Sequence, residues 1–233
     1  MDATPTTDLE RLATLDEPTR GRLYDWVIAQ RRPVSRDEVA AGAGISRPLA
    51  AFHLDRLADA GLLAVEYRRL TGRSGPGAGR PAKLYRRAPR QVSASVPPRT
   101  YQAAAELLAD AVEQLSAEVP PPVLREAAAA IGRDVGLAAR RAAGPRAGRG
   151  RLEAALLGAL TERGYEPTIE CDEIRLGNCP FDALVADHRQ LVCGMNLALA
   201  DGLLDGLVIG GLQASLAPED GYCCVRISRG PGA

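Results

Sequence analysis

Two helix-start signals separated by a glycine turn constrain the fold of this chain more than any other feature. Ser35 is followed three residues later by Glu38, the capping box in which each side chain can bond the other residue's backbone N–H. The short helix that begins there ends at AGAG, and glycines suit a tight turn. Ser46 then caps a second helix, SRPLAAFHLDRLADAGLL, which Gly61 ends. This order of elements predicts a helix-turn-helix.

The residues on either side complete a small domain. DLERLATLDEPTRGRLYDWVIAQ (8–30) has helical spacing of apolar residues, with Asp16 as the expected N-cap before Pro18. After the motif, LLAVEYRRL (62–70) and LYRRA (84–88) read as strands joined by the Gly- and Arg-rich loop TGRSGPGAGRPAK (71–83). We interpret this hairpin as a wing.

Charge supports contact with a polyanion. From Arg68 to Arg90 the chain carries eight basic residues and no acidic one. The net charge of zero hides a split, because residues 1–90 hold 16 Lys and Arg against 11 Asp and Glu, whereas residues 91–233 hold 13 against 18. A basic loop beside the second helix of the motif fits phosphate contact. The alternative is a winged domain that binds protein.

The second helix of the motif has a face that we expect to be buried, because Ala50, Leu54 and Leu57 follow 3–4 spacing. Phe52 on the opposite face can touch a thymine methyl in the major groove or, alternatively, pack under the wing. His53 lies to the side as a packing or phosphate-contacting residue. The predicted DNA contacts are Ser46, Arg47, Ala51, Phe52, Asp55, Arg56, Arg73, Arg80 and Lys83.

A family resemblance adds to this interpretation. ISRPLAAFHLDRLADAGLL followed by GRPAKLYRR resembles the winged helix-turn-helix of the ArsR-like bacterial transcriptional regulators, over roughly residues 8–90. The resemblance implies an α/β winged domain, a homodimer and a double-stranded DNA operator.

Neither a signal peptide nor a membrane span is expected, since MDATPTTDLE has no basic start and no apolar stretch approaches about 20 residues. We expect a cytoplasmic protein. Five cysteines in a reducing compartment favour buried thiols, metal ligands or redox chemistry over structural disulfides.

The middle of the chain predicts a linker and two contact helices. APRQVSASVPPRT (88–100) is polar and holds three prolines, which places a linker over residues 91–99. Two helical stripes follow within residues 100–148, and we expect one of them to mediate dimerisation. The stripes are Tyr101, Ala104, Leu108, Ala111 and Leu115, then Leu124, Ala128, Ile131, Val135 and Ala138.

The remaining residues, 149–233, predict a small sensor domain, so the expected fold class is α+β throughout. Two short strands flank a turn at Asp172–Glu173, a helical run reaches about Leu207, and YCCVRIS forms the last strand. Strand alternation turns Cys223 to the core and Cys224 outward. Cys179 is expected at a helix start, and Cys193 opens the apolar helix CGMNLALADGLLDGL. These three elements could bring Cys179, Cys193 and Cys223 together.

A second resemblance concerns these cysteines. NCPF, a helix containing VCGMNLALADGLLDGL, and the late CCVRI resemble the C-terminal domain of the SufR-type iron–sulfur repressors. The resemblance implies an iron–sulfur cluster held by Cys179, Cys193 and Cys223. Three thiolates and a weaker fourth ligand can hold a 4Fe–4S unit. Cys224 is an alternate third ligand, and the candidates for the fourth position are Cys171, Asp187 and His188. Free cysteines also pack as small apolar residues, so inert core thiols stay open as the alternative.

Three functions compete at this point. The first is a dimeric DNA-binding regulator, a repressor in our interpretation, which senses redox or iron–sulfur status. The second is a regulator of the same fold that responds to a small organic ligand. The third is an enzyme with a Cys179 nucleophile and His188, but no nucleotide loop, H-E-x-x-H or G-x-S-x-G pattern occurs, so we expect no enzyme.

Overall fold

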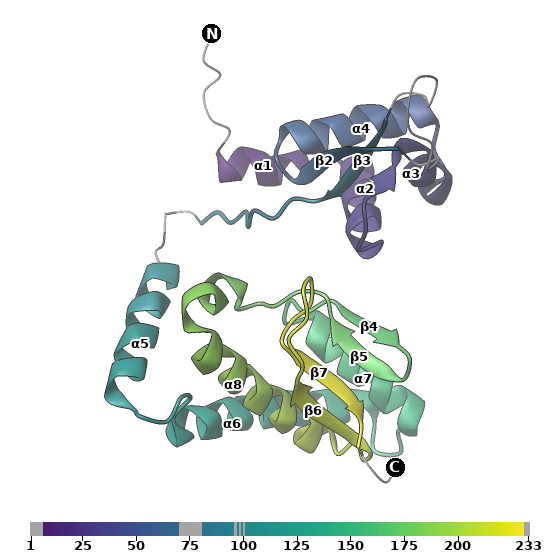
Figure 1. Cartoon of the computed structure of the whole chain (residues 1–233). Coiled ribbons are helices and arrows are strands. Elements are labelled where there is room, and N and C mark those ends of the chain that lie inside the picture. Colours follow the sequence, from purple (N-terminus) through teal and green to yellow (C-terminus); the bar gives the residue numbers. More distant parts are fainter. Residues whose placement is uncertain (1–6, 70–80, 96, 98, 100, 231–233) are drawn as a thin grey trace. The chain divides into compact units, whose positions relative to one another are not determined.

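The computed structural model describes residues 7–69, 81–95, 97, 99 and 101–230. The chain forms two compact units, residues 1–99 and 100–233 (Figure 1). The segment 100–148 and the segment 149–233, which we had separated, therefore belong to one unit. Within the described residues, no helix is both long and apolar enough to cross a bilayer.

The first unit begins with two helices, and the second starts at Pro18, as the expected cap before this residue implies. α1 (Asp8–Thr14) ends before the turn at Leu15, and α2 (Pro18–Ala29) starts a new axis. Glu17, not Asp16, caps α2, since its carboxylate accepts the backbone N–H groups of Thr19 and Arg20 at 3.0 and 2.8 Å. The prediction of Asp16 as the N-cap was wrong, because Glu17, next to Pro18, is the residue whose longer side chain reaches both N–H groups.

The helix-turn-helix follows as α3 (Arg36–Ala43) and α4 (Arg47–Asp59). The capping box of Ser35 and Glu38 is formed in both directions, and Ser46 caps α4. Gly44 ends α3 at φ +66°, a left-handed conformation that favours glycine. The local signals for both helices are thereby confirmed.

A three-stranded antiparallel sheet completes this unit in the order β1–β3–β2. β2 (Leu63–Arg68) and β3 (Ala82–Arg87) form the predicted hairpin, and the two-residue β1 (Val34–Ser35) adds an edge that the sequence did not reveal. Tyr85 of β3 belongs to the same buried core as Leu54 and Leu57 of α4. The hairpin is therefore packed against the second helix of the motif.

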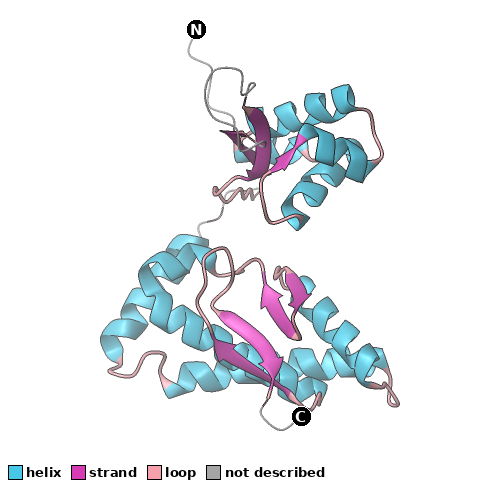
Figure 2. Ribbon diagram, turned by 45° about the vertical axis from the view of Figure 1, so that its right-hand side comes forward, coloured by secondary structure: helices cyan, strands magenta, loops and turns pink. Residues whose placement is uncertain are grey.

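The second unit combines four helices with a four-stranded antiparallel sheet (Figure 2). The helices are α5 (Tyr101–Leu115), α6 (Pro122–Ala143), α7 (Arg149–Thr161) and α8 (Asp182–Leu207). The sheet order is β4–β5–β7–β6, with β4 (Pro167–Glu170), β5 (Glu173–Leu176), β6 (Leu212–Leu216) and β7 (Val225–Arg229). Ile174, Leu176 and Ile227 are buried in a core shared with α7 and α8.

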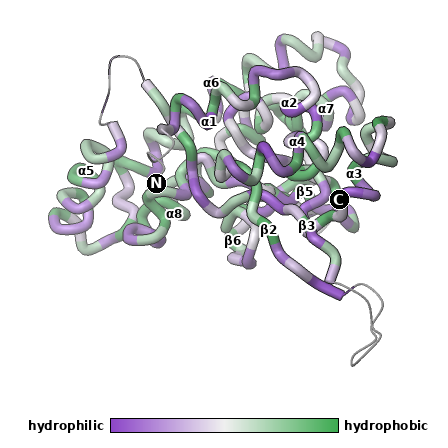
Figure 3. The backbone as a smooth tube through the Cα atoms, turned by 90° about the horizontal axis from the view of Figure 1, so that it is seen from above, coloured by the Kyte–Doolittle hydropathy of each residue, from purple (hydrophilic) through white to green (hydrophobic). Residues whose placement is uncertain are grey.

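Helix α5 leaves much of its apolar surface uncovered. Ala109 is its one buried residue, and hydrophobic and hydrophilic residues both recur along it (Figure 3). Every member of the first predicted stripe is exposed, namely Tyr101, Ala104, Leu108, Ala111 and Leu115. The second stripe, on α6, is divided: Ala128 and Val135 are buried, whereas Ile131 is 58% exposed.

Helices α6 and α8 approach so closely that their contact consists of backbone. Gly132 and Gly136 on α6 lie against the α8 backbone, and Gly202 and Gly206 on α8 lie against the α6 backbone; each pair has a spacing of four residues. A Cβ atom added at any of the four would come within 3.0 Å of the facing helix backbone, closer than real Cβ atoms approach. Only glycine permits this separation.

Replacing Gly202 by alanine should therefore destabilise the second unit, by about 1–3 kcal/mol, because the helices must move apart. Gly158 of α7 is the matched control, since a Cβ there meets nothing within 4 Å. Gly158→Ala should raise stability by about 0.5–1 kcal/mol through helix propensity. Urea unfolding of both variants measures the difference, and equal effects would contradict this account of the contact.

Candidate DNA interface and thiol cluster

Helix α4 presents a mixed face to solvent. Ala50, Leu54 and Leu57 are fully buried, as expected, while the Phe52 side chain is 53% exposed. Phe52 therefore does not pack under the wing. The Arg56 guanidinium lies 5.6 Å from the Phe52 ring centre, and the two form one exposed cation–aromatic surface.

The start of α4 is also exposed. Ser46 uses its hydroxyl to accept the Leu49 backbone N–H at 3.4 Å, and Arg47 pairs with Asp37 of α3 at the surface. Exposed ion pairs contribute little and exchange readily, so Arg47 stays available to a phosphate. Ala51 is half-buried beside Phe52.

Asp55 is bound within the protein. Its carboxylate accepts hydrogen bonds from Lys83 Nζ at 2.6 Å and Tyr85 Oη at 2.6 Å, and from Arg36 Nη2 at 3.1 Å. Desolvation raises the pKa of Asp55, but these hydrogen bonds and the charges of Arg36 and Lys83 outweigh it and lower the pKa overall. The network joins α3, α4 and β3, so Asp55 and Lys83, both predicted DNA contacts, fix the hairpin against the helix. Arg73 and Arg80 lie outside the described residues.

His53 links α4 to the first helices. It is 7% exposed, and its Nδ1 lies 3.5 Å from Glu17, the residue that caps α2. This placement is that of a packing residue.

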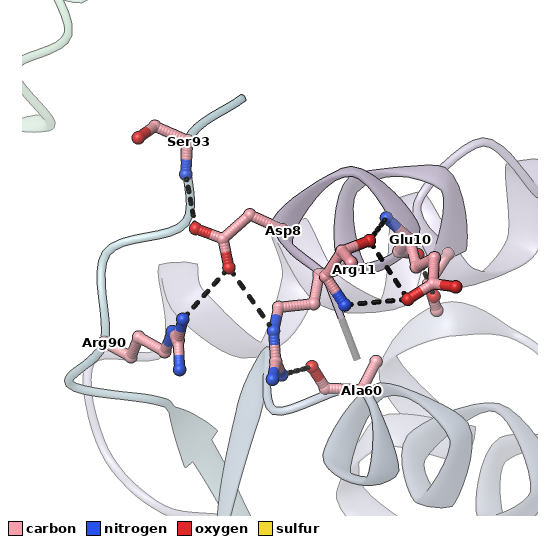
Figure 4. Close-up of polar contacts among 8 residues, drawn as sticks. Asp8, Glu10, Arg11, Ala60, Arg90 and Ser93 are labelled. Carbon is pink, nitrogen blue, oxygen red and sulfur yellow. Dashed lines mark hydrogen bonds and ion pairs between the residues drawn. The ribbon is translucent and has the colours of Figure 1, made fainter. Parts of the chain in front are cut away.

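The segment that leaves the hairpin is held by α1 (Figure 4). Asp8 accepts hydrogen bonds from Arg90 Nη2 at 3.1 Å and from the Ser93 backbone N–H at 3.4 Å. Arg11 of the same helix pairs with Asp8 and donates to the carbonyl of Ala60, at the end of α4. The start of the predicted linker is thus tied to the first unit.

Four of the five cysteines gather in the second unit. Cys193 lies inside α8 rather than at its start, because this helix begins eleven residues earlier, at Asp182. Cys179 lies in the segment before α8, and Cys223 and Cys224 directly precede β7. All four belong to one hydrophobic core, with Cys179 half-buried at its edge.

The expectation that Cys224 faces outward was wrong, since it is 9% exposed. Strand alternation does not apply to it, because β7 begins one residue later, at Val225. From Val225 onward the expected alternation of buried and half-exposed residues is present.

The thiols contact one another in sequence. Cys179 and Cys224 lie close enough to Cys223 for these thiols to shift one another's pKa, and Cys193 stands in the same relation to Cys224. Asn196 of α8 donates its Nδ2–H to Cys223 Sγ at 3.2 Å and accepts the Tyr165 hydroxyl at 2.5 Å. Hydrogen bonds from Cys179, Cys224 and Asn196 lower the pKa of Cys223, whereas the bond to Cys223 and burial raise the pKa of Cys179. The thiolate form is thereby favoured at Cys223 over Cys179.

The two other candidate ligands lie elsewhere. Cys171 is exposed in the β4–β5 turn at φ +49°. His188, at a break in α8, is 6% exposed and places Nδ1 3.1 Å from Glu113 of α5. The hydrogen bond to Glu113 raises the pKa of His188. Its ring is thus bound to α5 and not to the thiols.

The donor chemistry of the cluster suits a thiophilic metal or an iron–sulfur unit, because several thiols and one favoured thiolate are adjacent. Over the described residues, however, no three His, Cys, Asp or Glu side chains surround a common point in a metal-holding arrangement. A cavity of about 510 Å³ lies against the cluster, and Cys179, Cys223 and Cys224 form part of its lining. The cavity thus borders the half-buried Cys179 and the buried Cys223 and Cys224.

Comparison with known proteins bears on the first unit. Residues 15–66, which run from the end of α1 into β2, match the family described as "Helix-turn-helix domain". No curated protein and no solved structure matches the chain. The match supports a DNA-binding transcriptional regulator whose N-terminal unit carries the helix-turn-helix.

Proposed function

We propose that this protein is a homodimeric repressor that binds a double-stranded DNA operator through its N-terminal unit and is controlled by the thiol cluster of its second unit. The observation that carries the DNA-binding part is the exposed face of α4, with Phe52 and Arg56 stacked on it, in the helix that the family match includes. A helix-turn-helix protein inserts this second helix into the major groove.

Within this proposal the predicted contacts divide into two groups. Arg47 and Arg56 reach phosphates or guanine edges, and Phe52 and Ala51 contact base edges. Ser46 positions the helix start through its cap. Asp55 and Lys83 act by holding the hairpin, and Arg73 and Arg80 in the loop between its strands supply phosphate contacts.

The homodimer is proposed to form through α5. Its exposed stripe includes Tyr101, Leu108 and Leu115, which are 77%, 67% and 87% exposed in the single chain. Such a run of apolar residues at 3–4 spacing is typical of a helix that packs against another helix. Two-fold symmetry then matches two operator half-sites.

The sensing element is proposed to be the thiol cluster. Cys179, Cys193 and Cys223 would hold a 4Fe–4S cluster, which supplies sensitivity to oxidants and to iron supply when bound. Cys224 and Asn196 would orient Cys223 through the hydrogen bonds described above. A regulator for a small organic ligand is the second candidate, and the cavity beside the thiols is the observation that favours it.

The DNA-contact proposal predicts that Phe52→Ala relaxes the preference at one base step by about tenfold, without loss of folding. The exposed position of Phe52 is the reason, and footprinting or binding titrations against operator variants measure the effect. Leu57→Ala, at a fully buried position, should instead destabilise the unit by about 2–5 kcal/mol. A large drop in melting temperature on Phe52→Ala would contradict the assignment of Phe52 as a DNA contact.

The dimer proposal predicts that Leu108→Glu gives a monomer, because two charged side chains would be buried in the stripe. Sedimentation equilibrium should then report 24.6 kDa instead of twice that mass. Ile169→Glu is the control, since Ile169 is 61% exposed on β4 and should leave the dimer intact. A dimeric Leu108→Glu protein would place the interface elsewhere.

The cluster proposal predicts that protein purified without oxygen is brown, carries iron and sulfide, and bleaches in air. Cys179→Ser should lose the absorbance, whereas Cys171→Ser should keep it, because Cys171 lies in an exposed turn. Iron analysis and visible absorbance on the three proteins measure this. Colourless wild-type protein after reconstitution would favour the organic-ligand regulator.

A further inference from the structure

The cavity beside the thiol cluster combines reactive sulfur with charges of both signs. Cys179, Cys223 and Cys224 line one part of it. Exposed side chains of Asp182, Arg189 and Asp220 line another part, so the cavity opens to solvent. Its volume of about 510 Å³ falls in the range of small-molecule sites.

The charged side chains at this opening are free to meet a ligand. Within the described part of the chain, Asp182, Arg189 and Asp220 make no ion pair and no side-chain hydrogen bond, whereas the neighbouring Glu219 pairs with Arg175. One free guanidinium and two free carboxylates suit a zwitterion, whose carboxylate meets Arg189 and whose ammonium meets Asp182 or Asp220. Amino acids and small peptides have this charge pattern.

The sulfur atoms indicate the reactive group of such a ligand. Cys223 accepts the Asn196 side-chain N–H at 3.2 Å and contacts Cys179, and both sulfurs border the cavity. Thiolates exchange with disulfides. We propose that the cavity admits a low-molecular-weight disulfide of an amino-acid or peptide thiol, which oxidises Cys179 and Cys223 to a disulfide. Only the effect of this reaction on DNA binding rests on the proposed function.

The exchange has two balanced steps. The Cys223 thiolate attacks one sulfur of the ligand disulfide, so that a mixed disulfide forms and one ligand thiol leaves with a proton from solvent. Cys179 then loses its proton, attacks Cys223 Sγ and expels the second ligand thiol. The two protein thiols are oxidised by two electrons, and the ligand disulfide is reduced to two thiols.

Cys179, rather than Cys224, is the partner in the second step for a geometric reason. Adjacent residues have Cα atoms about 3.8 Å apart across a trans peptide, below the 4.4–6.8 Å usual for disulfides. A Cys223–Cys224 disulfide would therefore be strained. Cys179 comes from a separate segment, between β5 and α8, and carries no such constraint.

The test uses the full chain, reduced and iron-free, with glutathione disulfide as the probe at neutral pH. Acid quenching, alkylation and mass mapping should show a Cys179–Cys223 disulfide with no retained glutathione. Cys179→Ser should instead accumulate one glutathione on Cys223, Cys223→Ser should form neither product, and Cys171→Ser should match the wild type. First modification at Cys171, or no change at Cys179 and Cys223, would overturn the proposal.

Ligand recognition is tested separately from thiol reactivity. Arg189→Gln should slow the reaction with glutathione disulfide by about threefold, the size expected for one exposed ion pair. The reaction with uncharged hydroxyethyl disulfide should keep its rate. If Arg189→Gln slows the reactions with both disulfides equally, Arg189 does not recognise the ligand through its charge.

A parallel measurement separates this inference from the proposed function. Operator binding is titrated with the same oxidised and reduced samples. A disulfide that forms without changing operator binding supports the inference and contradicts thiol control of the regulator. Operator binding by a protein whose cluster thiols resist the probe supports the regulator and overturns the inference.

Discussion

The contact on which the second unit depends is the backbone approach of α6 and α8. Four glycines allow the two helices to come together, and the glycine face of α8 that lies against α6 determines which way its other side chains point. Cys193 and Asn196 face the thiol cluster, Ala200 and Leu203 enter the core, and Gly194 receives Pro120 of the α5–α6 connection. A helix in such close contact cannot turn freely about its axis. The backbone that carries Cys193 is therefore held in one orientation relative to the other thiols.

The same helix provides a physical connection from the thiols to α5. His188 lies at the break in α8 and binds Glu113, and Gln190 donates to the carbonyl of Val119 after α5. A change at Cys193 or Cys179 acts on the helix that carries both contacts. In the proposed regulator, an effector can change the populations of two dimer geometries only if it binds one of them more tightly than the other.

Signals that act within a few residues were predictable from the sequence. The capping box at Ser35, the cap at Ser46 and the buried face at Ala50, Leu54 and Leu57 all depend on spacing along one helix. The Asp55 network was not predictable, because its partners stand 19, 28 and 30 residues away and a polar residue on this helix fits DNA contact equally well. Cys224 was misplaced because strand alternation was extended past the start of β7. The sequence did indicate that Cys179, Cys193 and Cys223 could come together, and all three lie in one core, but the fourth member, Cys224, depends on how the segment before β7 packs.

The Asp55 network also resolves a conflict on the proposed DNA-facing helix. A lone carboxylate there would repel phosphates, and its removal from water would cost free energy. Arg36 and Lys83 together exceed its charge by one, and Tyr85 completes its hydrogen bonds. The helix keeps a net positive neighbourhood, and the same atoms hold β3 against it. Asp55, a predicted DNA contact, is thus better explained as the residue that fixes α4 and the hairpin relative to each other. Two elements that contact the same DNA site need such a fixed relative geometry.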